Sequence, residues 1–451
     1  MLEKLVASWQ QLFYRSDKNQ RIYYPISADM AYIEDIGNSD DINLTIRRNR
    51  TANVTVTLSH QGLPVAHQEI LVEQKNHKFL FGSNWGESTL ALVNGELSGR
   101  EKELAGLRNE LFLKLFNQVT LPFYWARFEP QRGKPQTQRI LNAAHWYVDH
   151  NCVVKGHPLC WHTLAPDWLL TMSNREILRA LLDRIQRDVS NFAGLIDQWD
   201  VVNEAVIMPI FDRYDNGITR LCRESGRIEL IRTMFDATRA TNPQATLLLN
   251  DFDVSPAYDI LIEGCLTAGV QIDVIGIQTH MHQGYWGTER TQSVLERFER
   301  FNLPIHFTEN TIVSGHLMPP EIIDLNDYQV DEWPSTPDGE QRQAQEVVLH
   351  YKTLLAHPDV QAITWWDLSD GGWLNAPAGL LRKDHSRKPV YDELLKLIKG
   401  EWWLSPTKRT TDANGKFVFN GFLGEYELSM EHQRCTFLVK EKGEASISIN
   451  L

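Results

Sequence analysis

The strongest constraint on the fold is a series of short apolar stretches, most of them ending at polar or acidic residues, that alternates with helix patterns. Eight stretches lie at 79–83, 118–121, 153–157, 198–203, 246–250, 274–278, 305–308 and 362–366. Helix patterns lie at 175–192, 223–241, 289–301, 340–356 and 390–398. Apolar runs of this length are typical of parallel strands buried on both faces, joined by crossover helices. The pattern predicts a (β/α)8 TIM barrel over residues 77–402.

Alternating apolar residues on both sides of this barrel predict a second, smaller module. Before the barrel they include Val54, Val56 and Val72, and after it Phe417 and Phe419. Neither flank can bury both faces of its strands alone, but together they offer enough strands for two packed sheets. We expect one β-sandwich made of residues 51–76 and 403–451, with residues 1–50 as an N-terminal extension. Two separate hairpins packed on the barrel are the alternative.

Two of the predicted barrel strands end at a glutamate. Glu204 follows the run 199–203, and Glu309 follows the run 304–308. The carboxyl ends of parallel barrel strands meet at one rim, so the two carboxylates are expected to face each other there. Hydrolysis of a glycosidic bond uses such a pair, one group as proton donor and the other as nucleophile or base. An inert, salt-bridged rim is the competing interpretation.

Charge and composition argue against several other classes of protein. The net charge of -13 disfavours binding to nucleic acid or to anionic membranes. The five cysteines show no ligand spacing, and His280 and His282 lack a third ligand at suitable spacing, so we expect no metal and no other cofactor. The N-terminus has no signal-peptide pattern. This indicates a cytoplasmic protein, or a secreted one if the chain starts after processing.

The residues at the strand ends resemble a known family. The motifs are Lys-Gly-His-Pro-Leu-Cys-Trp-His from residue 155, Trp-Asp-Val-Val-Asn-Glu from 199, Gln-Thr-His from 278, Phe-Thr-Glu from 307 and Trp-Trp-Asp from 365. In this order they resemble the family-10 glycoside hydrolases, the endo-β-1,4-xylanase family of barrel-fold retaining enzymes. The resemblance spans about residues 77–398. It implies a carbohydrate substrate, polysaccharide degradation and no cofactor.

The resemblance also implies a role for each residue of the site. It makes Glu204 the acid/base and Glu309 the nucleophile of a double displacement. It makes His280 the histidine that orients the nucleophile. The residues expected to bind substrate are Asn203 at the 2-hydroxyl, and His157, Trp161, Gln278, Trp366 and Trp373 around the sugar. Trp365 and Trp366 point in opposite directions on a strand, so only one can face the sugar, and the motif favours Trp366.

The chain departs from the family pattern where a second glycone sugar would bind. The family's Thr-x-Glu-Asn-x-x-Lys is here Thr120-Leu121-Pro122-Phe123-Tyr124-Trp125-Ala126, without its Glu, Asn and Lys. We therefore expect weak activity on unsubstituted xylan. The alternatives are the same chemistry on a non-xylan β-glycoside or glycoconjugate, with Phe123, Tyr124 and Trp125 facing the substrate, or a non-catalytic glycan-binding barrel.

A long acidic segment, residues 311–341, follows the second glutamate and holds four prolines. A loop of this length inside a compact domain is usually functional or disordered. It could wall the cleft, with Trp333 as a contact, or remain solvated.

Overall fold

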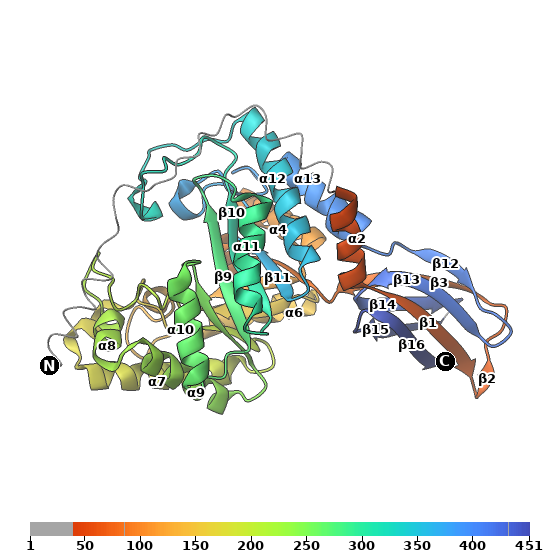
Figure 1. The fold of residues 1–451 in the computed structure, drawn as a ribbon, viewed down its shortest axis with the longest axis horizontal. Helices are drawn as coiled ribbons and strands as arrows, with labels where there is room; N and C mark the ends of the chain where they lie inside the picture. Colours follow the sequence, from red (N-terminus) through yellow and green to blue (C-terminus); the bar gives the residue numbers. More distant parts are fainter. Residues whose placement is uncertain (1–38, 85, 432) are drawn as a thin grey trace. The chain divides into compact units, whose positions relative to one another are not determined.

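A closed barrel of parallel strands forms the larger part of the chain (Figure 1). The computed structural model describes residues 39–84, 86–431 and 433–451. The strands are ordered β10-β11-β4-β5-β6-β7-β8-β9 around the barrel, which confirms the predicted (β/α)8 fold. Their bounds are β4 Leu80–Asn84, β5 Gln118–Pro122, β6 Val153–His157, β7 Gln198–Asn203, β8 Thr246–Asp251, β9 Val274–Met281, β10 Ile305–Ile312 and β11 Val360–Trp365.

Helices connect consecutive strands and cover the outside of the barrel. The α-helices of the barrel are α3 Glu87–Val93, α4 Gly99–Leu115, α5 Trp125–Phe128, α6 Thr137–Asp149, α7 Asn174–Phe192, α8 Gly217–Ser225, α9 Arg227–Thr241, α10 Pro256–Thr267, α11 Gly287–Glu299, α12 Pro337–Ala356 and α13 Pro389–Lys396. Short helical turns are η2 Asp167–Thr171, η3 Leu325–Asp327, η4 Trp373–Asn375 and η5 Leu397–Glu401. No helix in the described part of the chain is long and apolar enough to cross a membrane.

One predicted helix, 223–241, is wrong at its start. The structure has two helices there, α8 and α9, which meet at Gly226. Gly226 has φ +82°, a left-handed conformation that glycine adopts without steric cost. The predicted helix begins at Arg223, in the last turn of α8, and so runs across the break at Gly226.

The N-terminal extension was predicted to span residues 1–50. Residues 1–38 of it lie outside the described residues, and helix α2 (Ser39–Arg50) leads directly into the first strand.

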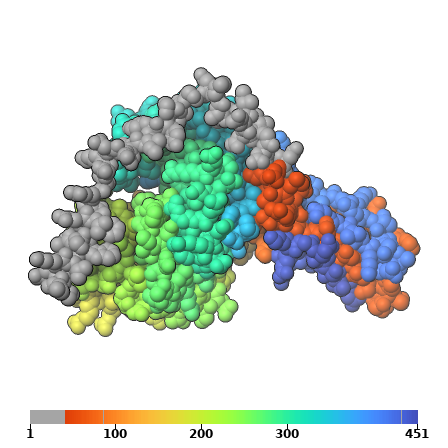
Figure 2. Space-filling model, viewed as in Figure 1, coloured from red at the N-terminus to blue at the C-terminus, as the bar shows by residue number. Residues whose placement is uncertain are grey.

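Two sheets outside the barrel, in which most neighbouring strands are antiparallel, combine strands from the N-terminal and the C-terminal segments of the chain. One has the order β13-β1-β16, with the short β2 on β1, and the other has the order β12-β3-β14-β15. The strands are β1 Thr51–His60, β2 Leu63–Pro64, β3 Glu69–His77, β12 Thr407–Thr410, β13 Lys416–Phe422, β14 Gly424–Met430, β15 Gln433–Val439 and β16 Gly443–Asn450. In Figure 2 the orange residues of the first segment and the blue residues of the last lie against one another.

The two N-terminal strands separate, one into each sheet. β1 lies between β13 and β16, and β3 lies between β12 and β14. The inward residues of both sheets share one core, in which Val54, Val56 and Val72 meet Phe419 and Tyr426. Two independent hairpins are therefore excluded, since each N-terminal strand takes both of its main partners from the C-terminal segment.

The acidic segment after β10 is held by a small apolar cluster of its own. Trp333 is 2% exposed, packs with Val313 and Met318, and donates from Nε1 to the His316 carbonyl at 2.9 Å. Of the two alternatives for this segment, the one with Trp333 in contact with substrate does not fit this burial. The segment's acidic groups reach another loop: Asp324 and Asp327 form ion pairs with Arg213, which follows β7.

We predict that the sandwich stabilises the whole chain. Deleting residues 405–451 exposes the apolar faces of β1 and β3, where each buried Val or Ile contributes about 1.5–3 kcal/mol. The truncated protein should lose its cooperative melting transition or melt well below the intact chain. A truncated protein with unchanged melting temperature and protease resistance would show that the barrel is independent of residues 403–451.

Neighbouring residues on β13 provide a matched pair for the same test. Phe419→Ala removes a ring that is 4% exposed and should cost about 3–5 kcal/mol in urea unfolding. Val418→Ala, at 60% exposure on the opposite face, should change stability by less than about 0.5 kcal/mol.

Candidate active site

The two glutamates lie at the carboxyl ends of β7 and β10. Glu204 follows Asn203, the last residue of β7, and Glu309 lies within β10. The backbone of Glu204 has φ +54°, and its N–H donates to the Asn250 carbonyl at 2.8 Å. A non-glycine residue in this left-handed region costs about 1–3 kcal/mol and is concentrated at functional sites. The barrel thus holds Glu204 in a conformation that the residue would not adopt in a free chain.

A chain of hydrogen bonds connects the two carboxylates. Asn250 donates from Nδ2 to Oε1 of Glu309 at 3.1 Å and to Oδ1 of Asn203 at 2.8 Å. Asn203 in turn donates to Oε1 of Glu204 at 3.3 Å. Gln278 donates to Asn203 at 3.1 Å and to Glu204 at 3.4 Å. Asn203 and Gln278, expected to bind substrate, are therefore also part of the frame that orients Glu204.

Two histidines flank the carboxylate of Glu309. Nε2 of His280 lies 3.1 Å from Oε2, and Nε2 of His157 lies 3.8 Å from Oε1. Burial acts to raise the pKa of Glu309, but the hydrogen bond with His280 and the charges of His157, His280 and Lys155 outweigh it. The resulting pKa of Glu309 is lowered from its usual value. This carboxyl group is held in its ionised form.

Glu204 has the opposite balance. Its side chain is 15% exposed, and Trp161 donates from Nε1 to Oε2 at 2.8 Å. Burial, and after it the negative charge of Glu309, raise the pKa of Glu204 to about 8. The pair therefore consists of one protonated and one ionised carboxyl group at neutral pH.

Aromatic rings surround this pair. Trp366 is 6% exposed and its ring lies 5.5 Å from that of His157, while the ring of Trp373 lies 4.6 Å from that of His280. Trp365 is fully buried and donates to the Ala378 carbonyl at 3.0 Å. The structure thus gathers all nine predicted site residues around one place, and it puts Trp366 rather than Trp365 at the site.

A buried carboxylate that is not among the predicted site residues supports His157. Asp200 is fully buried and accepts from Nζ of Lys155 at 2.7 Å, and it lies 2.7 Å from Nδ1 of His157. The available signal was Lys155 in an otherwise apolar strand, two residues before His157 and so on the same face. Asn250, which is also not among the predicted site residues, bonds Glu309 directly.

The segment after β5 corrects one expectation about the substrate. Leu121 and Phe123 are fully buried, and Trp125 is 5% exposed, with Nε1 donating to Glu129 at 3.1 Å. Phe123 and Trp125 thus pack in the core and do not face a substrate. Tyr124 alone of the three aromatics lies at the site, its ring 5.6 Å from the rings of His157 and Trp161.

A possible metal group lies elsewhere in the barrel. Among the described residues, ligand atoms of Glu299, His357 and Asp359 lie within 4.8 Å of one another. The guanidinium of Arg50 bonds the carbonyls of His357 and Val360 on the same turn, which places a positive charge beside this group. Repulsion between like charges makes this a poor cation site.

Several known proteins with similar sequences or folds are xylanases. A family model described as glycosyl hydrolase family 10 matches residues 87–397. Endo-1,4-beta-xylanase A of Caldicellulosiruptor saccharolyticus is 24% identical, covering 60% of this chain and 80% of its own. Endo-1,4-beta-xylanase A of Xylanibacter ruminicola is 28% identical, covering 55% and 74%. Xylanase 10B of Thermotoga petrophila, solved with xylobiose, is 24% identical with TM-score 0.58, covering 72% of this chain and 95% of that one.

A parallel barrel with this pair of strand-end glutamates fits the class of glycoside hydrolases. The chain belongs to glycosyl hydrolase family 10, since the family model covers more than half of it. It is an endo-1,4-β-xylanase-like enzyme whose substrate is a carbohydrate. The non-catalytic and non-xylan alternatives are not favoured by these relatives.

We predict that the two carboxyl groups titrate far apart. With each labelled with ¹³C, Glu204 should titrate near pH 8, and Glu309 below the usual range of a glutamate. Glu309→Gln should lower the pKa of Glu204, because it removes the charge of Glu309. The pKa should still stay above the usual value of a glutamate, because burial remains the larger cause. An unchanged pKa of Glu204 in Glu309→Gln would show that the carboxyl groups do not interact.

The segment after β5 generates a second prediction. With no Glu, Asn or Lys at 121–126, few polar contacts to a second glycone sugar are expected, each worth about 0.5–1.5 kcal/mol. An aryl β-xylobioside should therefore be hydrolysed with a kcat/KM less than about tenfold above that of the aryl β-xyloside. A much larger advantage for the disaccharide would mean that Tyr124 or another group recognises the second sugar. Plain xylan measured in parallel should be a weak substrate.

Proposed function

We propose that the chain hydrolyses β-1,4-linked xylan-type chains by double displacement, with Glu309 as nucleophile and Glu204 as acid/base. The observation that carries the proposal is the opposite direction of the two pKa shifts in carboxyl groups joined through Asn250 and Asn203. A nucleophile must be ionised and a general acid protonated at the same pH. The xylanases among the relatives support the substrate class.

In the first step Glu309 attacks the anomeric carbon, and Glu204 gives its proton to the leaving oxygen. His280 and Asn250 hold the attacking carboxylate in place, each by a hydrogen bond to one of its oxygens. When the sugar is esterified to Glu309, the negative charge beside Glu204 disappears. The pKa of Glu204 then falls, so the same group can accept a proton from the incoming water.

The other site residues fit supporting roles in this scheme. Asn203, next to the acid, is placed to bind the 2-hydroxyl of the sugar, a contact that strengthens in the transition state. Trp161 bonds the acid and Trp366 and Trp373 border the site, so their faces can pack on the apolar side of a pyranose ring.

We predict that replacing the two glutamates gives different losses. Glu309→Ala should abolish turnover of every substrate, because no nucleophile remains. Glu204→Ala should reduce hydrolysis of xylan by about 10²–10⁴-fold, yet largely spare the first step with a dinitrophenyl glycoside, whose leaving group needs no proton. Azide should then restore turnover and give the β-glycosyl azide.

The anomer of the first-formed product is the control for the mechanism. NMR of the wild-type reaction should show retention, the outcome of two displacements. An inverted product would contradict the double displacement. Azide rescue of Glu309→Ala and not of Glu204→Ala would mean that the two glutamates have each other's proposed role.

A further inference from the structure

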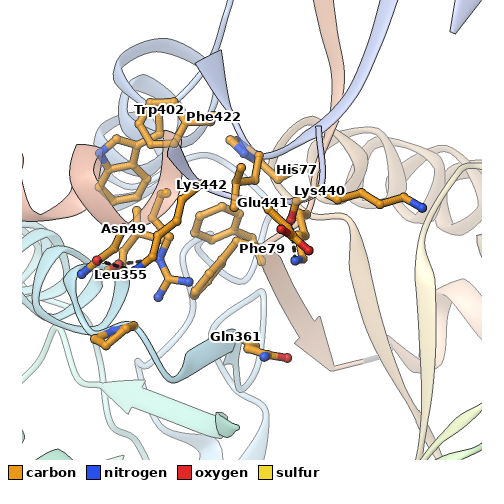
Figure 3. Close-up of a pocket in the computed structure, with 15 residues that line it drawn as sticks. Asn49, His77, Phe79, Leu355, Gln361, Trp402, Phe422, Lys440, Glu441 and Lys442 are labelled. Atoms are coloured by element: carbon orange, nitrogen blue, oxygen red, sulfur yellow. Dashed lines mark hydrogen bonds between the residues drawn. The ribbon is translucent and has the colours of Figure 1, made fainter. Parts of the chain in front are cut away.

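A cavity of about 400 Å³ lies at the opposite end of the barrel from the paired glutamates (Figure 3). Its walls come from the end of α2, the first residues of β4, the turn before β11, and the turn between β15 and β16. Glu204 and Glu309 lie at the carboxyl ends of their strands, whereas Phe79 precedes β4 and Gln361 is near the start of β11. Strands of five or six residues separate the two ends by roughly 15–20 Å.

The lining of this cavity is positively charged in a chain whose net charge is -13. Its basic residues are Arg50, Lys78, Lys440 and Lys442, and its acidic residue is Glu441. Within the described part of the chain, none of these five forms an ion pair, although the basic groups lie on segments brought together from both ends of the chain. The negative charge of Asp359 acts on Arg50, but Asp359 is not part of the lining. An unpaired concentration of positive charge attracts an anion.

Arg50 is the fixed centre of this charge. Its Nε donates to the Leu355 carbonyl at 2.8 Å, and its Nη2 donates to the Val360 carbonyl at 2.7 Å. The guanidinium lies over the ring of Phe79, 4.9 Å from the centroid. Burial lowers the pKa of Arg50 to about 10, so the group stays charged at neutral pH. Among the described residues, Nη1 has no hydrogen-bond partner and is left to bind a ligand.

The remaining lining suits a ring with hydroxyl groups. Phe79, Trp402 and Phe422 line the cavity as nearly buried aromatic groups. Gln361 adds an amide donor and acceptor, and Asn49 adds a second amide, whose Nδ2 also donates to the Ala356 carbonyl at 2.9 Å. Figure 3 shows Lys442 turned toward Asn49, to which its Nζ donates at 3.1 Å, whereas Lys440 extends away from the other labelled residues. The volume is in the range of small-molecule sites, about 300–1,000 Å³.

We propose that this cavity is a second binding site, for a sugar that carries a carboxylate or phosphate group. The anionic group lies against Arg50, Lys78 and Lys442, and the sugar ring lies over the aromatic floor with its hydroxyls bonded to the amides. This proposal does not depend on the roles proposed for Glu204 and Glu309, because ligand binding is measured directly and needs no catalytic turnover.

The test is calorimetric titration of the full chain with glucuronate, glucose 6-phosphate and glucose. At least one anionic sugar should bind, and glucose should not bind detectably. Lys442→Glu and Lys78→Glu should each weaken binding by about tenfold, as expected for reversing one charge in contact with the ligand. Both lysines are exposed, so the fold should tolerate the changes. Lys416→Glu, an equal charge change on β13 away from the cavity, should leave binding unchanged.

Three outcomes would overturn the proposal. If glucose binds as tightly as the anionic sugars, the positive lining does not select the ligand. If Lys442→Glu and Lys78→Glu bind as the wild type does, the sugar lies elsewhere. If inorganic phosphate alone binds as tightly as glucose 6-phosphate, the cavity takes a bare anion and not a sugar. Hydrolysis of an aryl β-xyloside should be unchanged in both lysine variants, which separates this site from the catalytic one.

Discussion

The chemistry of this barrel depends on the buried carboxylate of Asp200. A buried carboxylate without a partner is strongly destabilising, and here Lys155 and His157 from the neighbouring strand compensate it. Because Nδ1 of His157 is occupied by Asp200, its Nε2 faces Glu309. The same group of charges helps to keep Glu309 ionised, and the charge of Glu309 then helps to keep Glu204 protonated. The ion pair in the core thus contributes to the protonation of both carboxyl groups, beside the hydrogen bond of His280 to Glu309 and the burial of Glu204.

The barrel was predictable from the sequence because its local signals agree with its global fold. Buried parallel strands are apolar throughout, and the polar residue that ends each run marks the rim, so Glu204 and Glu309 could be placed without a structure. The errors arose where one residue overrides a pattern. The predicted helix 223–241 runs across Gly226, whose left-handed backbone separates α8 from α9. A tryptophan such as Trp333 suits the wall of a cleft and a core equally well. A sequence pattern cannot decide between the two.

The parts of the site that escaped prediction depend on pairing between strands. Lys155 and Asp200 lie on β6 and β7, and nothing in either strand alone shows that their side chains meet. Asn250 looks the same whether it ties the rim or bonds a nucleophile. The aromatic run Phe123 to Trp125 posed a similar problem, since an aromatic residue serves equally in a core and in a sugar site. Only the direction of each ring, fixed by the turn into α5, distinguishes Tyr124 from its two neighbours.

The arrangement of the two outer sheets has a consequence for synthesis of the chain. β1 pairs with β16, with Val54 opposite Ala445, and β3 pairs with β14. Both N-terminal strands therefore leave the ribosome hundreds of residues before their partners. During that time each has unpaired edges, which are templates for pairing with other chains. Contacts of such long sequence separation also form slowly. The sandwich must wait for the last strand, so a chain released early would carry β1 and β3 with both edges of each unpaired.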